Sequence, residues 1–428
     1  MSARSGALIF LAALPLLLLC SCSPDAGLDE AEILPLNGDV IVLGGGIAGL
    51  TTALEAARHG ASVILCFRER PDERWMWRDG ILGTGEEGNA AALEGALRHY
   101  GGSEGKEWHY RLLARRADES LAWLSRETGL KVIPAGGFLY LPENLSCDQA
   151  WERLYNKALD EGVRILEGVQ VEELLFGKAG QAAGIKLADS HGLKHTAYAP
   201  AVVLADGGYL GDGERMEKLA PGRPVASWRG RGEGDSVRLA RAAGLDLVQE
   251  NLFSYTLAVE EGQKWVEADP PPGTLLIVDK EIYSFLPQAE AELASAVLQS
   301  EAGTGYLLVA EANLEAGAEP NWPRYPGLGA FLEAYGIDLP QLYRRFSRPQ
   351  GYFYGCPVKA AAAYCLGGIA VNEAGNVLRA DEPVPGLYAV GESAGGLHGA
   401  ALMPGAALTE ALAWGRRIGE AASRYAQG

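Results

Sequence analysis

Three glycines, Gly44, Gly46 and Gly49, follow a buried apolar run and open a helical pattern. In a Gly-x-Gly-x-x-Gly turn, the first glycine permits the tight turn, the second lets the backbone approach a pyrophosphate, and the third lets the helix pack against the strand. Unpaired N–H groups at the helix N-terminus then bind phosphate. Residues 51–59 have a helical pattern and residues 61–67 a strand pattern, which supplies the βαβ context. This spacing predicts a dinucleotide-binding site.

An acidic residue at the end of the second strand often binds the ribose hydroxyls of such a ligand. Here the strand runs into Phe67 and Arg68, and Glu69 is the nearest acid. Two interpretations stay open at this position. Glu69 binds the ribose, or it belongs to a solvated charge cluster behind the strand.

Other periodic segments supply the elements that must position this site. The 428 residues include 56 glycines and are 48% hydrophobic, which suits a large α/β protein with room for two domains. Helical spacing covers residues 107–128 and 406–426, and residues 201–208 form a second buried strand that ends in glycines. Alternation over residues 163–176, followed by short strands, predicts a β-meander. Prolines and aromatic residues between about 249 and 349 indicate an inserted domain.

Residues 1–22 are predicted to be an export signal and not part of the fold. Arg4 precedes an apolar stretch, residues 7–19, that is too short to span a bilayer comfortably. The ending Leu-Cys-Ser-Cys resembles the bacterial lipobox, so Cys22 would be the lipidated first residue of the mature protein. Residues 23–37 would be the tether, and the protein would lie at the bacterial cell envelope on the extracytoplasmic face. A cleaved signal without lipid is the alternative.

Charge and cysteine spacing exclude several classes of site. The net charge of -18 and the pI near 4.9 argue against nucleic-acid binding and against adhesion to anionic lipid through general charge. Outside the signal, the four cysteines are too scattered for zinc or iron–sulfur ligation, and the chain has no Cys-x-x-Cys-His haem motif. No metal site is predicted.

Three further blocks carry a family resemblance. Residues 232–244 are similar to a Thr-Gly-Asp-Gly helix, residues 385–392 read Pro-Gly-Leu-Tyr-Ala-Val-Gly-Glu, and residues 395–399 read Gly-Gly-Leu-His-Gly. Together they resemble the flavoprotein superfamily of fumarate reductase, succinate dehydrogenase and 3-ketosteroid dehydrogenase, from about Gly38 to the end. The resemblance implies an α/β fold: a doubly wound, Rossmann-like FAD-binding domain with a β-meander, interrupted by a smaller α+β cap domain. The FAD-binding domain would comprise residues 38–248 and 350–428, and the cap domain residues 249–349.

The resemblance also implies noncovalent FAD and a set of residues around it. Val171 would pack by the adenine, Asp235 would contact the cofactor, and Glu392 would bind its ribityl or ribose region. Backbone N–H groups of Ala407 and Leu408, at a helix N-terminus, would stabilise negative charge on the reduced flavin. The alternative for Asp235 and Glu392, as ordinary helix-cap and turn residues, stays open. The implied cofactor residues are Gly44, Gly46, Ala48, Gly49, Glu69, Gly83, Thr84, Val171, Asp235, Gly391, Glu392, Ala407 and Leu408.

The substrate side departs from the fumarate reductases. The arginine of their His-Gly-x-Asn-Arg motif falls on Leu402, and Ala363 and Tyr364 stand where histidines precede their two-glycine strand. Residues 282–288 also lack the arginine and acid of the family's cap motif. Gripping a dicarboxylate depends on arginine geometry. Fumarate and succinate are therefore not expected as substrates.

Aromatic residues remain in the expected substrate pocket. Tyr354 lies where ketosteroid dehydrogenases carry an active-site tyrosine, and Tyr364 and His398 are the other catalytic candidates. A phenol near flavin N5 acts as acid or base when its pKa is suitable. The alternative is that these aromatic side chains only fill the space between two domains.

The sequence thus predicts an exported, lipid-anchored FAD oxidoreductase that transfers hydride at N5 to or from a small organic substrate. Because the chain lacks haem and iron–sulfur motifs, electrons would pass to or from a separate quinone, cytochrome or free flavin. Two alternatives stay open: a flavin-holding electron-transfer lipoprotein without substrate turnover, and a desaturase that resembles ketosteroid dehydrogenases.

Overall fold

The computed structural model describes residues 36–428, except residues 86–87, 103, 228–231 and 287–289. The chain divides into two compact units, Met1–Leu34 and Pro35–Gly428, and the described residues belong to the second. The predicted export signal, Cys22 and most of the predicted tether therefore lie outside the described residues. Within the described ranges, no helix is long and apolar enough to cross a bilayer.

A six-stranded sheet, in the order β21-β22-β11-β2-β3-β7, carries the glycine-rich turn. Neighbouring strands are parallel except at the edge, where β21 runs antiparallel to β22. Strands β2, β3 and β11 are buried along their length, which explains their continuous apolar runs. The strands are Val40–Leu43 (β2), Val63–Phe67 (β3), Arg164–Glu167 (β7), Ala201–Leu204 (β11), Asn376–Arg379 (β21) and Glu382–Ala389 (β22).

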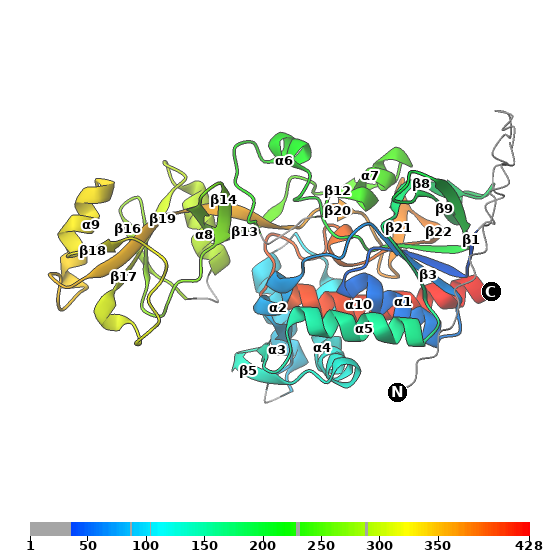
Figure 1. The fold of residues 1–428 in the computed structure, drawn as a ribbon, viewed down its shortest axis with the longest axis horizontal. Helices are drawn as coiled ribbons and strands as arrows, with labels where there is room; N and C mark the ends of the chain where they lie inside the picture. The colour runs from blue at the N-terminus through cyan, green and yellow to red at the C-terminus, as the bar shows by residue number, and fades with distance from the viewer. Residues whose placement is uncertain (1–35, 86–87, 103, 228–231, 287–289) are drawn as a thin grey trace, which may run out of the picture. The chain divides into compact units, whose positions relative to one another are not determined.

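Helices cover one face of this sheet, where α1, α5 and α10 lie side by side (Figure 1). Alternate strand residues such as Val40, Val42 and Leu65 share one apolar core with the helices. The predicted helix at residues 107–128 is confirmed, and the C-terminal helix ends one residue later than expected. The helices of this layer are Ile47–Arg58 (α1), Arg74–Asp79 (α2), Ala90–Gly101 (α3), Glu107–Thr128 (α4), Cys147–Asp160 (α5) and Ala406–Gln427 (α10).

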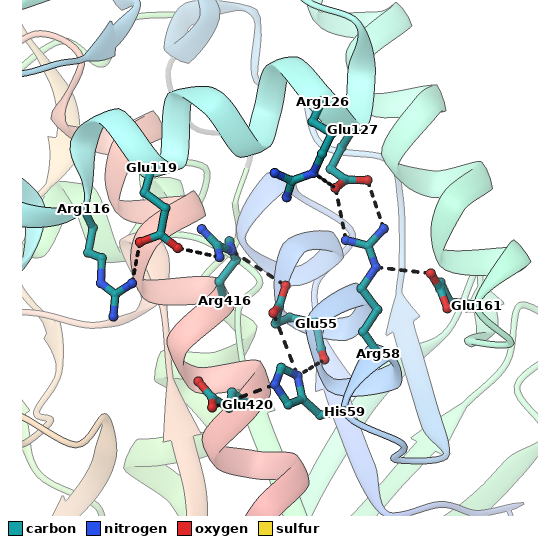
Figure 2. Close-up of polar contacts among 10 residues, drawn as sticks. All are labelled: Glu55, Arg58, His59, Arg116, Glu119, Arg126, Glu127, Glu161, Arg416 and Glu420. Atoms are coloured by element: carbon teal, nitrogen blue, oxygen red, sulfur yellow. Dashed lines mark hydrogen bonds and ion pairs between the residues drawn. The ribbon is translucent and has the colours of Figure 1, made fainter.

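Ion pairs join neighbouring helices of this layer (Figure 2). Arg58 on α1 contacts Glu127 on α4 at 2.9 Å and Glu161, the residue after α5, at 3.2 Å. Arg416 on α10 contacts Glu119 on α4 at 2.8 Å. Helices α1 and α10, which are far apart in the sequence, are thereby both joined to α4.

Glu127 is the most buried carboxylate of this network, with a side chain only 4% exposed. Burial alone raises the pKa of a carboxyl group, but the hydrogen bond and charge of Arg58, together with Lys157, outweigh it and lower the pKa of Glu127 to about 2. The pair is therefore ionised in the folded protein at neutral pH.

The other face of the central sheet carries a β-meander. Ile41, Ile64 and Val202 point to this face and pack against Ile185 and Leu187 of the meander. The predicted α/β class and meander are confirmed, but a sheet and the short helix α7 cover this face, not a second full helix layer. The apolar alternation of the meander strands already fills the space that such helices would occupy. Its elements are Leu36–Asn37 (β1), Gln170–Phe176 (β8), Ala182–Ala188 (β9) and Lys194–Tyr198 (β10), with Asp235–Ala242 (α7) beside it.

A separate seven-stranded sheet, here called the cap sheet, has the order β14-β13-β19-β17-β15-β16, with β18 paired to β19. Its longest strand, β19 (Phe353–Cys365), pairs with β13 at one end and with β17 and β18 at the other. The sheet thus extends beyond residue 349, the predicted end of the cap. Apolar clusters pack it against α8 and α9. The other cap elements are Phe253–Glu261 (β13), Lys264–Glu267 (β14), Leu275–Val278 (β15), Glu281–Ser284 (β16), Glu290–Gln299 (α8), Gly305–Ala310 (β17), Glu311–Asn313 (η2), Arg324–Tyr325 (β18), Leu328–Tyr335 (α9) and Pro340–Arg344 (η3).

Two small sheets, β4-β6-β5 and β12-β20, complete the described strands. The pair β12-β20 lies where the chain enters and leaves the cap sheet. The remaining elements are Ile81–Leu82 (β4), Val132–Gly136 (β5), Leu139–Pro142 (β6), Gly213–Leu219 (α6), Leu247–Val248 (β12), Gly368–Ile369 (β20) and Gly391–Ser393 (η4).

Candidate functional site

A cavity of about 240 Å³ opens at the carboxyl ends of β2, β3 and β11. Leu43, Phe67 and Ala205 line it, and these residues end or directly follow the three strands. Open parallel sheets bind ligands at this edge, where strand ends and helix N-termini meet. The predicted dinucleotide site and the cavity therefore coincide in the fold.

The glycine turn has the geometry that its sequence predicts. Gly44 has a φ of 114°, a conformation that side chains disfavour. A Cβ on Gly49 would collide with the carbonyl oxygen of Gly44, so only glycine lets α1 begin so close to the turn. Gly49 does not line the cavity, whereas Gly44, Gly46 and Ala48 do.

Glu73 closes the N-terminus of α1 from across the turn. Its two carboxylate oxygens accept the backbone N–H of Ile47 at 2.9 and 3.1 Å. A Cβ placed on Gly46 would lie 2.6 Å from the same carboxylate. Burial raises the pKa of Glu73 to about 7. The carboxylate oxygens stand in for the anionic phosphate oxygens that such a helix terminus binds, so the residues present fit a dinucleotide pyrophosphate.

A second group of charged residues lies where β3 and α7 border the cavity. Arg68 contacts Asp235 at 2.8 Å, and Arg238 donates to the backbone carbonyl of Val171 at 2.9 Å. Asp235 begins α7, and it lines the cavity together with Val171 and exposed Glu69. The structure thus brings these three predicted cofactor residues together at one opening.

Glu392 and Ala407 approach the cavity from the C-terminal part of the chain. A Glu392 oxygen accepts the backbone N–H of Cys365 at 2.8 Å, which fixes the carboxylate beside β19. Gly391, Glu392 and Ala407 all line the cavity. Ala407 lies in the first turn of α10, whereas the side chain of Leu408 is buried in the core. The positive end of the α10 dipole therefore faces the cavity.

Gly83 and Thr84 lie away from this cavity, although the resemblance implied that they contact the cofactor. The backbone N–H and hydroxyl of Thr84 both donate to Asp118 on α4, at 2.8 and 2.5 Å. A Cβ on Gly83 would meet the ring of Tyr140. Neither residue lines the cavity.

The three predicted catalytic residues separate into a close pair and a distant residue. Tyr364 lines the cavity, and its ring contacts that of His398 edge-on, with centroids 5.7 Å apart. Burial raises the pKa of the Tyr364 phenol well above its ordinary range. Tyr354 lies ten residues earlier on the same strand, which is about 33 Å at 3.3 Å per residue.

Tyr354 instead belongs to the far end of the cap sheet. Its hydroxyl lies 3.4 Å from a Glu311 oxygen, and its backbone pairs with Val309 and Arg324. We therefore remove Tyr354 from the candidate catalytic set. Tyr354 does not line the cavity that Tyr364 lines.

A smaller cavity of about 50 Å³ lies between the cap sheet and the loop that precedes α10. Ala363 and Leu402, the two positions where the fumarate reductase groups are replaced, both line it. The backbone N–H of Leu402 donates to the Ser254 hydroxyl on β13 at 3.4 Å. Among the described residues, no arginine or lysine lines this cavity.

Sequence reasoning missed two acids of the larger cavity, Glu73 and Asp206. Burial raises the pKa of Asp206 to about 6, and its carboxylate accepts the Ser236 backbone N–H at 2.9 Å. Asp206 directly follows a buried strand, a position that could have marked it as a site residue. Glu73 had no such signal, because it lies in a charged stretch that is typical of solvated loops.

The chain is similar to known proteins over most of its length. The model of the family described as FAD binding domain matches residues 39–408. Fumarate reductase (cytochrome) of Shewanella frigidimarina is 25% identical over 91% of this chain and 77% of that protein. L-aspartate oxidase of Streptomyces coelicolor is 29% identical over 90% of this chain and 68% of that protein. The structure of 3-ketosteroid delta1-dehydrogenase from Sterolibacterium denitrificans shares the fold, with a TM-score of 0.76, 15% identity and coverage of 91% and 99% of the two chains.

Proposed function

The chain belongs to the FAD binding domain family and is an FAD-dependent oxidoreductase, and from this premise we propose that it transfers hydride between flavin N5 and a small organic substrate other than fumarate or succinate. One observation carries the proposal. The glycine turn, the α10 N-terminus and Tyr364 line one cavity, and Leu402 and Ala363 line the smaller cavity beside the cap sheet.

Bound FAD would supply a ring atom that accepts or gives a hydride. The chain's own residues would hold and polarise it. The α1 N-terminus would bind the pyrophosphate, and the α10 N-terminus at Ala407 would stabilise negative charge on the ring. Arg68 would keep Asp235 at the adenosine side.

Tyr364 is the residue that we assign to proton donation beside the ring. Its buried phenol keeps its proton at neutral pH, because burial and the nearby Glu410 charge both raise its pKa. It would therefore donate a proton or a hydrogen bond and would not act as a base. His398 packs edge-on against the ring and would hold Tyr364 in position.

Leu402 and Ala363 support the exclusion of dicarboxylates. A buried carboxylate without a cationic partner costs several kcal/mol, so the apolar pair disfavours fumarate and succinate. Asp79 and Glu290 also line this cavity and would repel a dianion, so a neutral unsaturated or aromatic compound suits this surface better. Electrons would come from or go to a separate quinone, cytochrome or free flavin at the extracytoplasmic face.

Anaerobic reoxidation of the dithionite-reduced protein tests the proposal. A panel of neutral unsaturated compounds should contain at least one that reoxidises the flavin rapidly, while fumarate should not exceed the free-flavin background. Tyr364→Phe should slow that reoxidation at least tenfold, whereas Tyr388→Phe, a buried tyrosine that does not line the cavity, should not. Rapid reoxidation by fumarate would refute the substrate exclusion. A panel without any acceptor would favour the electron-transfer lipoprotein.

A further inference from the structure

A buried polar cluster lies in the helix layer. It is separate from the 240 Å³ cavity at the glycine turn, here called the FAD cavity. It consists of His109 on α4, His398 in the loop before α10, and Glu410 on α10. Their exposed fractions are 0%, 4% and 1%, and one donor atom from each lies within 4.8 Å of the others. None of the three lines the FAD cavity. Residues from three separate segments therefore present nitrogen and oxygen atoms to one buried point.

The hydrogen bonds of this cluster are incomplete. His398 Nε2 lies 2.5 Å from Glu410 Oε2. Within the part of the chain that the structure describes, both ring nitrogens of His109 and the second oxygen of Glu410 have no hydrogen-bond partner. Native cores contain few unpaired buried polar groups, because each one loses its hydrogen bonds to water without replacement. Because the two nitrogens of one imidazole point in different directions, a single occupant would satisfy one His109 nitrogen together with the Glu410 oxygen.

The donor chemistry selects the kind of occupant. Two imidazoles and a carboxylate offer lone pairs, which is the usual donor set of zinc and related transition metals. We propose that His109, His398 and Glu410 bind a divalent transition-metal ion, with zinc as the best match and a water as the fourth ligand.

The surroundings agree with a structural metal. Tetrahedral zinc with bonds of 2.0–2.2 Å places its donors about 3.4 Å apart, so the three side chains need shifts of about 1 Å to close around it. Trp108 and Trp414 stack above the cluster, with ring centroids 5.1 Å apart, and Trp414 also contacts the His109 ring. The ion would tie α4, α10 and the His398 loop together behind Tyr364.

The sequence predicted no metal site. Residues 109 and 398 are almost three hundred positions apart and share no motif spacing. Only the packing of α4 against α10 brings them together. The proposal does not depend on the identity of the substrate.

Zinc content of the purified flavoprotein tests the proposal, with Zn²⁺ alone as the probe. After removal of metal with a chelator, the protein should take up stoichiometric zinc and gain thermal stability. His109→Gln should lose at least nine-tenths of the zinc and of the stability gain while it keeps its FAD absorbance and circular dichroism. The control His191→Gln, an exposed histidine in the meander, should bind zinc normally.

If His109→Gln does not fold, X-ray absorption at the zinc edge of the wild-type protein tests the proposed ligands. It should show two imidazole nitrogens and a carboxylate oxygen around the metal. Two results would overturn the proposal: wild-type protein that neither contains zinc nor gains stability with it, or a folded His109→Gln variant that retains stoichiometric zinc. In either case, buried water would be the occupant.

Discussion

The carboxylate of Glu73 occupies the place at the N-terminus of α1 where the sequence predicts a phosphate. One N–H group cannot serve both anions fully, and two negative charges at this distance repel each other. Cofactor binding must therefore protonate Glu73 or move it. No local pattern could have revealed this residue, because only the return of the chain after β3 places it against the turn.

The pKa of Glu73 leads to a pH-dependent FAD affinity. Burial raises this pKa to about 7, and a bound pyrophosphate raises it further, so binding takes up a proton above neutral pH. The affinity of the apoprotein for FAD should therefore fall as the pH rises from about 6 to about 8. Fluorescence titration of apoprotein with FAD measures this dependence.

Two variants separate this effect from a general loss of binding. Glu73→Gln should bind FAD more tightly than the wild type at the higher pH and with little pH dependence. Glu69→Gln, at the exposed acid of the same cavity, should keep the wild-type pH dependence whatever its affinity. A wild-type affinity that does not change across this range would contradict the assignment.

At the level of elements, local sequence patterns predicted the bounds of those helices and strands that depend on local residue spacing. The bounds of α4 match the helical spacing of residues 107–128, and β3 ends at Phe67 as expected. The long strand β19 was harder to predict from the sequence, because its ends pair with strands that lie far apart in the sequence. Tyr354 was misplaced for this reason: its position depends on the pairing of β19 with β17 and β18.

The ion pair between α1 and α4 predicts how stability depends on pH. The pKa of Glu127 is depressed from 4.5 to about 2, so its contribution is complete above about pH 4.5 and disappears as the pH falls toward 2. Glu127→Gln should lower the free energy of unfolding at neutral pH by roughly 2 kcal/mol, and the difference should shrink in acid. Urea unfolding at several pH values measures it.

The exposed pair of Lys194 and Glu172, 3.0 Å apart on the meander, provides the control. Glu172→Gln should change the free energy of unfolding by less than about 0.5 kcal/mol, because solvent screens exposed pairs. Equal losses of the free energy of unfolding in the two variants would show that burial of Glu127 does not strengthen its ion pair with Arg58.

At the scale of the whole molecule, we propose an exported lipoprotein whose tether precedes the folded unit. Cys22→Ala should move the protein from the membrane fraction to the soluble periplasm and leave its yellow colour intact. Cys20→Ala should do little, because Leu19 and not a small residue precedes it. Fractionation of cells that express each variant measures this. Release of the Cys20 variant alone would reassign the lipidated residue, and retention of both in the cytoplasm would refute the export signal.

Cofactor analysis of the purified protein tests the central claim most directly. Acid denaturation should release stoichiometric FAD from the wild type, and Gly46→Val should contain almost none, since its side chain would fill the space between α1 and Glu73. Gly95→Val, on the open side of α3, should keep its FAD. Flavin that stays with the precipitate, flavin released as FMN, or a folded Gly46→Val variant with full FAD would contradict the account.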